Sequence, residues 1–141
     1  MKISIVNGPN LNLLGKREPG IYGSQNFEDF FKGLNQKYPS VDLFYYQSNI
    51  EGELINELQR VGFEHDGIII NPGAYTHTSI AIGDAIAAIT TPAIEVHITN
   101  IYAREEFRML SHISSKCKGK ICGLGLQGYE LALQYFLMNS L

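Results

Sequence analysis

An arginine and a tyrosine share one polar stretch of the sequence, and together they could do acid or base chemistry. Arg17 and Tyr22 lie within residues 7–23, which contain two prolines, four glycines and three asparagines. This composition predicts a long irregular loop, and such loops in compact domains are often functional. A tyrosine hydroxyl has a pKa of about 10, which a nearby arginine would lower toward neutrality. We interpret residues 16–24, approximately, as an active-site lid; the alternative is a surface loop whose Tyr22 packs on the core.

A second pair of residues has the spacing of an oriented acid or base. Glu95 and His97 stand two apart in an apolar run that predicts a strand, so both side chains project from the same face. A carboxylate beside an imidazole can hold its tautomer and raise its pKa, as a catalytic acid requires. The alternative is a histidine that is merely hydrogen-bonded at the end of a strand.

Further polar groups follow two of the predicted strands. Asn71 offers a donor and an acceptor, and Gly73 would let the backbone approach a ligand. His77 ends this loop, where it could face a ligand or lie on the surface at the start of a helix. Directly after His97, the backbone N–H groups of Ile98 and Thr99 suit a carboxylate or a phosphate.

The hydrophobic pattern predicts the elements that must position these residues. Short apolar runs indicate strands, and apolar residues at helical spacing indicate helices. Strands are expected at residues 3–6, 41–46, 67–70, 93–97 and 120–122, and helices across 27–34, 54–61, 82–89, 103–110 and 126–137. Their alternation predicts an α/β fold, a flavodoxin-like three-layer sandwich with a five-stranded parallel sheet in the order 2-1-3-4-5.

Polar clusters occur just after every predicted strand. They fall at residues 7–10, 47–49, 71–73, 97–100 and 123–125. Open parallel sheets bind ligands in the crevice beyond the carboxyl ends of their strands. We therefore expect these clusters to converge on one pocket.

Composition limits the function further. A chain of 141 residues fits a single catalytic domain, residues 1–141, and its net charge of −3 without a basic stripe argues against nucleic-acid binding. The longest apolar runs are shorter than the roughly 18 residues of a membrane helix, and we expect a cytoplasmic protein with no membrane partner. Four histidines and two cysteines show no ligand spacing, so we expect no metal.

The helix across residues 82–89 is apolar on more than one side, with Asp84 inside it. A helix of this kind favours a subunit interface. Asp84 could then reach the site of a neighbouring subunit.

A glycine motif near the carboxyl end could be mistaken for a nucleotide site. Residues 123–128 match the G-x-G-x-x-G pattern, but the chain ends before the acidic residue that should follow about twenty positions later. We interpret the glycines as a tight strand-to-helix turn. A non-catalytic, flavodoxin-like nucleotide- or phosphate-binding module remains the alternative function.

Four blocks of sequence, in order along nearly the whole chain, resemble one enzyme family, type II 3-dehydroquinate dehydratase. The blocks are NGPNLNLLGKREPGIYG at 7–23, INPGAYTHTS at 70–79, EVHITNIYAREEFR at 95–108 and GLQGYELAL at 125–133. The resemblance implies a flavodoxin-like protomer in a dodecamer built from trimers. It also implies anti elimination of water from 3-dehydroquinate to 3-dehydroshikimate through an enolate, in the shikimate pathway and without a cofactor.

The same resemblance implies roles for the catalytic residues. Tyr22 would take the proton next to the ketone, and Arg17 would help to keep it ionised. His97 would protonate the departing hydroxyl while Glu95 orients it. Asn10 would hold a water against the enolate oxygen.

Substrate-binding roles are implied as well. Asn71, His77 and Arg108 would bind substrate hydroxyls, and the backbone amides of Ile98 and Thr99 would bind the carboxylate. Elimination from a β-hydroxy ketone needs a base on one face, an acid on the other and donors at the enolate oxygen. The residues matched to the family supply all three.

The chain departs from the family pattern at a few positions. Asp84 resembles an acidic residue contributed across the trimer interface, but Gly83 precedes it where arginine is common, at a helix-propensity cost of roughly 1 kcal/mol against alanine. Thr99 stands where serine is commoner, and its methyl would tighten the carboxylate pocket. Tyr102 and Met109 stand where histidine is frequent, so the edge of the site would differ in charge.

Overall fold

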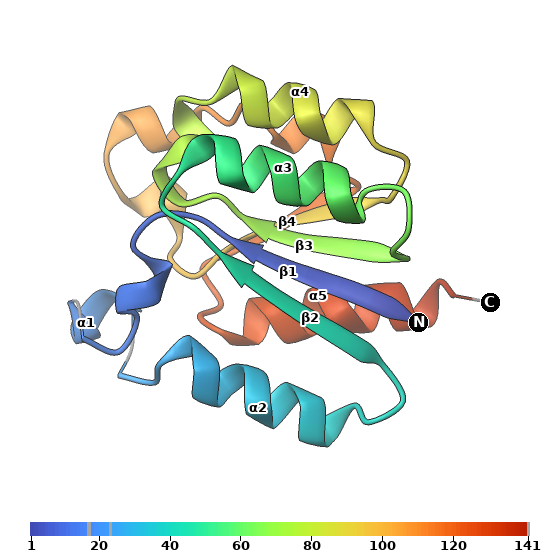
Figure 1. Cartoon of the computed structure of the whole chain (residues 1–141). Helices are drawn as coiled ribbons and strands as arrows, with labels where there is room; N and C mark the ends of the chain where they lie inside the picture. The colour runs from blue at the N-terminus through green and yellow to red at the C-terminus, as the bar shows by residue number, and fades with distance from the viewer. Residues whose placement is uncertain (17, 23, 141) are drawn as a thin grey trace.

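The computed structural model describes residues 1–16, 18–22 and 24–140 (Figure 1), and the side chains of Pro19 and Tyr22 are not described. The strands are β1 (Lys2–Asn7), β2 (Asp42–Gln47), β3 (Gly67–Asn71), β4 (Ala93–His97) and β5 (Gly119–Cys122). The α-helices are α1 (Pro19–Tyr22), α2 (Phe27–Lys37), α3 (Glu51–Val61), α4 (Ile80–Ala88) and α5 (Gln127–Met138). The short 3-10 helices are η1 (Leu11–Leu13), η2 (Gly73–His77), η3 (Ile101–Ala103), η4 (Glu106–Met109) and η5 (Ser114–Lys116).

The five strands form one parallel sheet in the order β2-β1-β3-β4-β5, which confirms the predicted topology. β1 pairs on both sides, and its last residue, Asn7, is opposite Gln47 of β2 and Asn71 of β3. These three strands therefore finish level with one another. Polar residues at their carboxyl ends meet at a single edge of the sheet.

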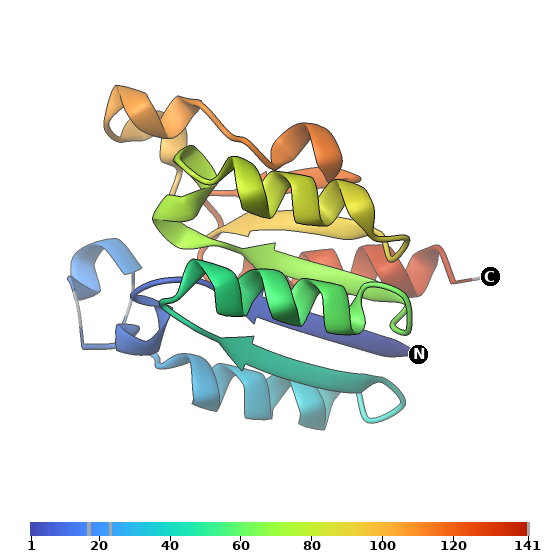
Figure 2. The ribbon, with the colours of Figure 1, turned by 45° about the horizontal axis from the view of Figure 1, so that its top comes forward.

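Helices cover both faces of this sheet, as Figures 1 and 2 show: α3 and α4 lie on one face, and α2 and α5 on the other. The residues of β3 alternate between the two cores. Ile69 packs in the core under α2 and α5, whereas Ile68 and Ile70 pack in the core under α3 and α4. A strand buried on both faces must be apolar at every position, which explains the continuous run at 67–70.

Side-chain caps set where two of the helices begin. The Asn26 side chain accepts a hydrogen bond from the backbone N–H of Asp29 at 2.8 Å, and Ser79 accepts one from Ile82 at 2.9 Å. Each cap satisfies an N–H group that would otherwise lack a partner in the first turn. Ser79 thereby starts α4 directly after the loop that carries His77.

The helix expected across residues 103–110 is present only in part, as the short 3-10 helix η4. The preceding 3-10 helix η3 ends at Ala103, and Arg104 between the two is extended. The Asn100 side chain accepts a hydrogen bond from the backbone N–H of Tyr102 at 3.1 Å. Such a local bond stabilises a tight turn in competition with a regular helix.

The amino-terminal polar stretch is also more regular than expected. It contains η1, and its described part includes the single helical turn α1, which begins at Pro19. Proline suits the first position of a helix because its fixed φ matches and its missing N–H is not needed there. Figure 1 shows this turn beyond the carboxyl ends of the strands, away from the sheet.

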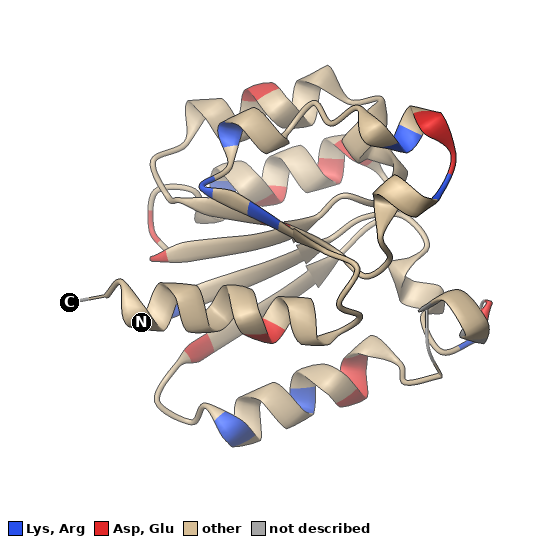
Figure 3. Ribbon diagram, turned by 180° about the vertical axis from the view of Figure 1, so that it is seen from behind, with Lys and Arg blue, Asp and Glu red and all other residues tan. Residues whose placement is uncertain are grey.

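Charged positions of both signs occur on the helices and loops of the side seen in Figure 3. Among the described residues, no helix has the length and apolar character that crossing a bilayer requires.

Candidate active site

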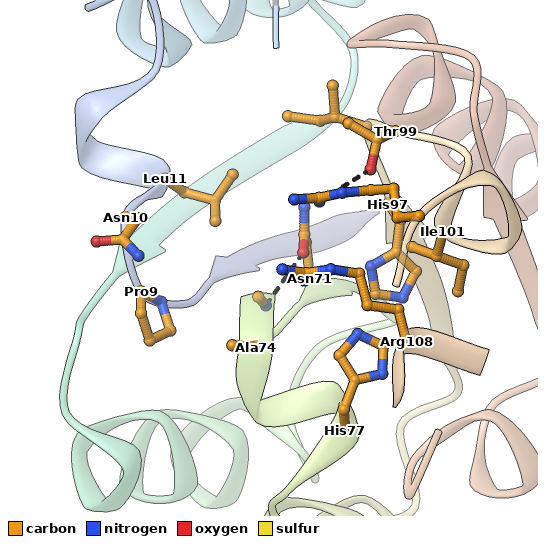
Figure 4. A pocket seen from close by; sticks show the side chains of 13 residues that line it. Pro9, Asn10, Leu11, Asn71, Ala74, His77, His97, Thr99, Ile101 and Arg108 are labelled. Atoms are coloured by element: carbon orange, nitrogen blue, oxygen red, sulfur yellow. Dashed lines mark hydrogen bonds between the residues drawn. The ribbon is translucent and has the colours of Figure 1, made fainter. Parts of the chain in front are cut away.

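A cavity of about 150 Å³ lies at the carboxyl edge of the sheet (Figure 4). Its walls come from loops that follow β1, β3 and β4. The lining residues are Pro9, Asn10, Leu11, Asn71, Gly73, Ala74, His77, His97, Ile98, Thr99, Ile101, Arg104 and Arg108. The volume is close to that of an engineered cavity of about 150 Å³ that binds benzene, so it suits one six-membered ring.

Glu95 and His97 form the expected pair on β4. Nε2 of His97 lies 2.6 Å from Oε1 of Glu95, and the carboxylate is completely buried. Ser111 donates to the same oxygen at 3.2 Å, and the hydroxyl of Ser114 donates to the other oxygen. Burial alone would raise the pKa of Glu95, but the hydrogen bonds from His97 and Ser114 outweigh it and hold that pKa below its usual value. The carboxylate therefore stays charged beside the imidazole.

His77 faces the cavity and does not lie on the surface. It is buried, and its ring centroid is 6.3 Å from that of His97 with the planes at 22°. Nδ1 of His77 lies 2.7 Å from the carbonyl oxygen of Leu110, which can only accept. Burial lowers the pKa of His77, so the neutral form with the proton on Nδ1 is favoured and Nε2 is an acceptor.

Asn71 closes the floor of the cavity between β1 and β4. Its side chain accepts a hydrogen bond from the backbone N–H of Gly73 at 3.1 Å and donates one to the hydroxyl of Tyr129 at 2.9 Å. Gly73 has a φ of +60°, and a Cβ there would approach the carbonyl oxygen of Pro9 at 3.0 Å. Glycine thus allows the loops after β1 and β3 to pack together.

Asn10 has a left-handed backbone, with φ at +69°, a region that asparagine tolerates better than most residues. Its backbone N–H donates to the side chain of Asn49 at 3.1 Å. In Figure 4, Asn10 and Leu11 lie on one side of the pocket and His77, His97 and Arg108 on the other.

Two arginines give the cavity a positive wall. Nε of Arg108 lies 2.5 Å from a carboxylate oxygen of Glu105, and its guanidinium lies 4.9 Å from the centroid of the Phe107 ring. Nη1 of Arg104 donates to the hydroxyl of Thr99 at 3.4 Å. Arg104 also lies 4.0 Å from Glu105. A wall of this kind favours an anionic ligand.

The strand-end backbone at His97 and Ile98 is held by the glycine turn that follows β5. The N–H of Gly123 donates to the carbonyl of His97 at 3.2 Å, and that of Gly125 to the carbonyl of Ile98 at 3.0 Å. Both glycines have positive φ, +88° and +61°. The motif at 123–128 is thus a tight turn between β5 and α5, as expected.

The predicted places of Arg17 and Tyr22 at the site are not tested by the described residues, and Asp84 lies away from the cavity. Arg17 lies outside the described residues, as does the side chain of Tyr22, although the backbone of α1 is described. Asp84 is exposed on α4 and is not part of the cavity wall.

Residues that support the site were not anticipated from the sequence. Ser111, Ser114 and the Leu110 carbonyl all belong to the segment that follows η4, and they hold Glu95 and His77. Tyr129 belongs to an apolar helix, where a tyrosine is expected to be core. Their contacts join distant parts of the chain, so no local spacing indicates them.

The groups in the cavity can do acid–base chemistry on a small, hydroxylated anion. His97 with its buried carboxylate can transfer a proton, His77 and Asn71 can bind hydroxyl groups, and Arg108 can bind negative charge. Among the described residues, no group of three or more histidine, cysteine, aspartate or glutamate side chains is arranged to hold a metal ion.

Comparison with known proteins finds one family throughout. The profile of the family "Dehydroquinase class II" matches residues 1–137. The 3-dehydroquinate dehydratase of Caldicellulosiruptor bescii is 53% identical over 94% of this chain and 93% of its own length, and that of Actinobacillus pleuropneumoniae is 52% identical over 95% and 88%. The crystal structure of the type II dehydroquinase from Butyrivibrio crossotus superposes with a TM-score of 0.92 at 48% identity, covering 96% of this chain and 97% of that one.

Proposed function

This chain belongs to the class II dehydroquinase family, and from that premise we propose that it catalyses the dehydration of 3-dehydroquinate. The reaction is an anti elimination in the shikimate pathway that yields 3-dehydroshikimate and water. A base removes a proton from the carbon next to the ketone, and an enolate forms. The enolate then reforms the ketone as the carbon–oxygen bond of the β-hydroxyl breaks. The observation that carries the proposal is the buried Glu95–His97 pair facing a ring-sized, positively lined cavity.

His97 is the general acid of this proposal. Its Nε2 is held by Glu95 at 2.6 Å, so Nδ1 is the nitrogen that meets the ligand. A proton on Nδ1 would pass to the departing hydroxyl, which leaves as water. Glu95 stabilises the protonated imidazole because its own pKa is held low and it stays ionised.

Tyr22 is the proposed base, with Arg17 beside it to stabilise the phenolate. The family resemblance supports these roles, and so does the location of the described neighbours of Tyr22. Ile21 and Ser24 line a second cavity of about 780 Å³ that shares Ile98, Thr99 and Arg104 with the first. The described residues Ile21 and Ser24 thus lie next to the site, which supports the proposal that residues 16–24, approximately, form a lid over it. A closed lid would exclude water and complete the catalytic set.

The remaining residues bind and polarise the substrate. Asn10 holds a water against the enolate oxygen, where a donor lowers the barrier. Asn71, His77 and Arg108 bind the hydroxyl groups. The backbone N–H groups of Ile98 and Thr99 bind the carboxylate, next to Arg104. The mechanism needs no metal, cofactor or Schiff base.

The enzyme is further proposed to act in the cytoplasm as a homododecamer built from four trimers, each chain forming one catalytic domain. Asp84 would reach the site of a neighbouring subunit. The outer face of α4 supports a contact of this kind, since the exposed residues Ile80, Ala81, Ala87 and Ala88 share one helix face with the exposed Asp84. A contiguous apolar face of this kind suits burial by a second copy.

A turnover assay tests the proposed reaction. Purified protein mixed with 3-dehydroquinate should produce a conjugated enone, followed by its near-ultraviolet absorbance. The rate should be unaffected by a chelator or by borohydride, and His97→Ala should remove most of it. An intact wild-type oligomer without turnover would exclude the proposal. Binding of FMN or a nucleotide by such an inactive protein would support the binding-module alternative.

Solution size tests the proposed assembly. Light scattering coupled to gel filtration should give a mass of about twelve chains for wild type. Asp84→Ala should lower the turnover rate. Asp84→Asn keeps the size of the side chain but removes its charge, so this variant shows whether the charge itself is required. A stable, fully active monomer would contradict the role of Asp84.

A further inference from the structure

A chain of buried hydrogen bonds runs beneath the candidate active site. Asn7 and Asn71 end the neighbouring strands β1 and β3 and are directly opposite each other in the sheet. Tyr129 of α5 approaches both from the core side. Its hydroxyl donates to Oδ1 of Asn7 at 2.8 Å and accepts from Nδ2 of Asn71 at 2.9 Å. Asn7 and Tyr129 are completely buried and Asn71 is 4% exposed, so solvent does not compete for these bonds.

One backbone N–H determines the direction of every bond in this chain. The N–H of Gly73 can only donate, and it lies 3.1 Å from the Asn71 side chain, which must therefore present Oδ1 to it. Nδ2 of Asn71 then faces Tyr129 and donates to its oxygen. The single hydroxyl proton of Tyr129 is left for Asn7, which must present Oδ1 in turn.

This arrangement leaves one hydrogen of Asn71 for the cavity. Nδ2 carries two hydrogens, and Tyr129 accepts only one of them. Asn71 lines the cavity whose other walls carry His77, His97 and Arg108. The second hydrogen is therefore the group that this side chain can offer to a ligand.

We propose that Tyr129 is a positioning residue of the dehydration, which orients Asn71 as a hydrogen-bond donor to a substrate oxygen. The inference rests on the proposed function and goes beyond it, since Tyr129 acts on the substrate only through Asn71. Without the hydroxyl, the Asn71 amide would keep its bond to Gly73 but lose the bond that holds Nδ2. Its donor hydrogen would then no longer be fixed toward the cavity.

The hydroxyl is not needed for packing. The Tyr129 ring packs edge-on against Phe27, with centroids 5.0 Å apart, and a phenylalanine ring would fill the same space. Burial raises the pKa of Tyr129, so its hydroxyl keeps its proton across the physiological range. The hydrogen-bond pattern is therefore the same at every pH at which the enzyme works.

Tyr129→Phe tests the inference in the steady-state assay, with Tyr135→Phe as the control. Both tyrosines belong to α5, but Tyr135 is exposed and its ring packs edge-on against Phe136, with centroids 5.6 Å apart. Asn71 binds the substrate before and during the reaction, so Tyr129→Phe should raise KM about tenfold and change kcat less, whereas Tyr135→Phe leaves KM within about twofold. An unchanged KM in Tyr129→Phe would overturn the inference.

A double-mutant cycle separates positioning from a general structural effect. If Tyr129 acts through Asn71, the KM effect of Tyr129→Phe should vanish in an Asn71→Ala background. The same tenfold effect in both backgrounds would overturn the inference. If Tyr129→Phe does not fold, Asn7→Leu/Tyr129→Phe replaces both polar partners by apolar ones of similar shape and should restore folding with the raised KM.

Failure of the inference can be told apart from failure of the proposed function. Wild-type protein that does not convert 3-dehydroquinate overturns both. Wild-type turnover together with an unchanged KM in the folded Tyr129→Phe protein overturns the role of Tyr129 alone.

Discussion

The backbone carbonyl of Leu110 determines which nitrogen of His77 carries its proton. The carbonyl oxygen lies 2.7 Å from Nδ1 and can only accept, so Nδ1 is protonated and Nε2 has a free lone pair. Leu110 begins a segment that continues through Ser111 to Ser114, which hold the Glu95 carboxylate. One stretch of chain after η4 thus orients both histidines of the site. Its placement is the basis of three of the predictions below.

We predict that His77 makes the fold sensitive to acid. Burial lowers its pKa in the folded state below the ordinary value of 6.5. Between these two pKa values the unfolded chain binds more protons than the folded one, so the free energy of unfolding falls as the pH falls through this window. Urea midpoints at pH 7.5 and 5.5 should therefore differ less in His77→Gln than in wild type.

His65 is the control for that experiment. Its pKa is also lowered, first by burial, but its ring is only partly buried. His65→Gln should consequently remove a smaller share of the acid sensitivity. The same pH dependence in wild type and His77→Gln would contradict the assignment.

Ser114→Ala should destabilise the protein and weaken the general acid. The hydroxyl of Ser114 donates to a buried carboxylate, and removal of one partner of a buried charged group costs about 1–3 kcal/mol. Loss of this donor should also raise the pKa of Glu95. The stabilisation from Glu95, present above its unfolded pKa and lost as the pH falls through its folded pKa, would then disappear at a higher pH. Denaturant unfolding and kcat against pH measure both effects.

Ser115→Ala is the matched control, since Ser115 is the exposed neighbour of Ser114. It should leave stability and rate near wild type. Equal behaviour of the two alanine variants would show that Glu95 does not depend on Ser114.

Gly83→Ala should destabilise the protein even though alanine favours helices by about 1 kcal/mol. A Cβ at Gly83 would lie less than 3.0 Å from the carbonyl oxygen of His112, closer than real Cβ contacts. The close approach of the segment between Leu110 and Ser114 thus requires glycine at this position. We expect the free energy of unfolding, measured with a chemical denaturant, to fall by about 1–3 kcal/mol. The turnover rate should also fall.

Gly33→Ala provides the comparison within α2. A Cβ at Gly33 would meet nothing within 4 Å, so this change should stabilise the fold by about 0.4–1 kcal/mol. A stabilising Gly83→Ala would show that the segment can move away from α4 at little cost.

Tyr22→Phe should keep the fold and lose the chemistry. General base catalysis typically contributes about 10²–10⁴-fold to a rate, and we expect kcat to fall within that range with the thermal midpoint unchanged. Tyr135→Phe, at an exposed tyrosine of α5, should retain wild-type kcat. Near-full activity of Tyr22→Phe would assign the base to another group.

Much of the fold could be predicted because strands and helices leave a periodic signal. The pattern of apolar residues indicated all five strands, and the alternation of elements indicated the parallel order that the structure confirms. The prediction for residues 103–110 was less accurate because their apolar and charged residues have helical spacing. The structure instead has a 3-10 turn just before this segment, which the Asn100 side chain stabilises. A single side-chain hydrogen bond of this kind is not visible in a periodic pattern.

The sequence by itself determined that Glu95 and His97 share a face, because residues two apart in a strand must do so. It also determined that Asn10, Asn71 and His97 lie at or just after the ends of strands that converge. Only the tertiary structure decided how these groups are held. Ser114 is 19 residues from Glu95, and Tyr129 is 122 residues from Asn7. Contacts over such separations depend on how helices and loops pack on the sheet, and that packing sets the proton on His77 and the donor that Asn71 presents.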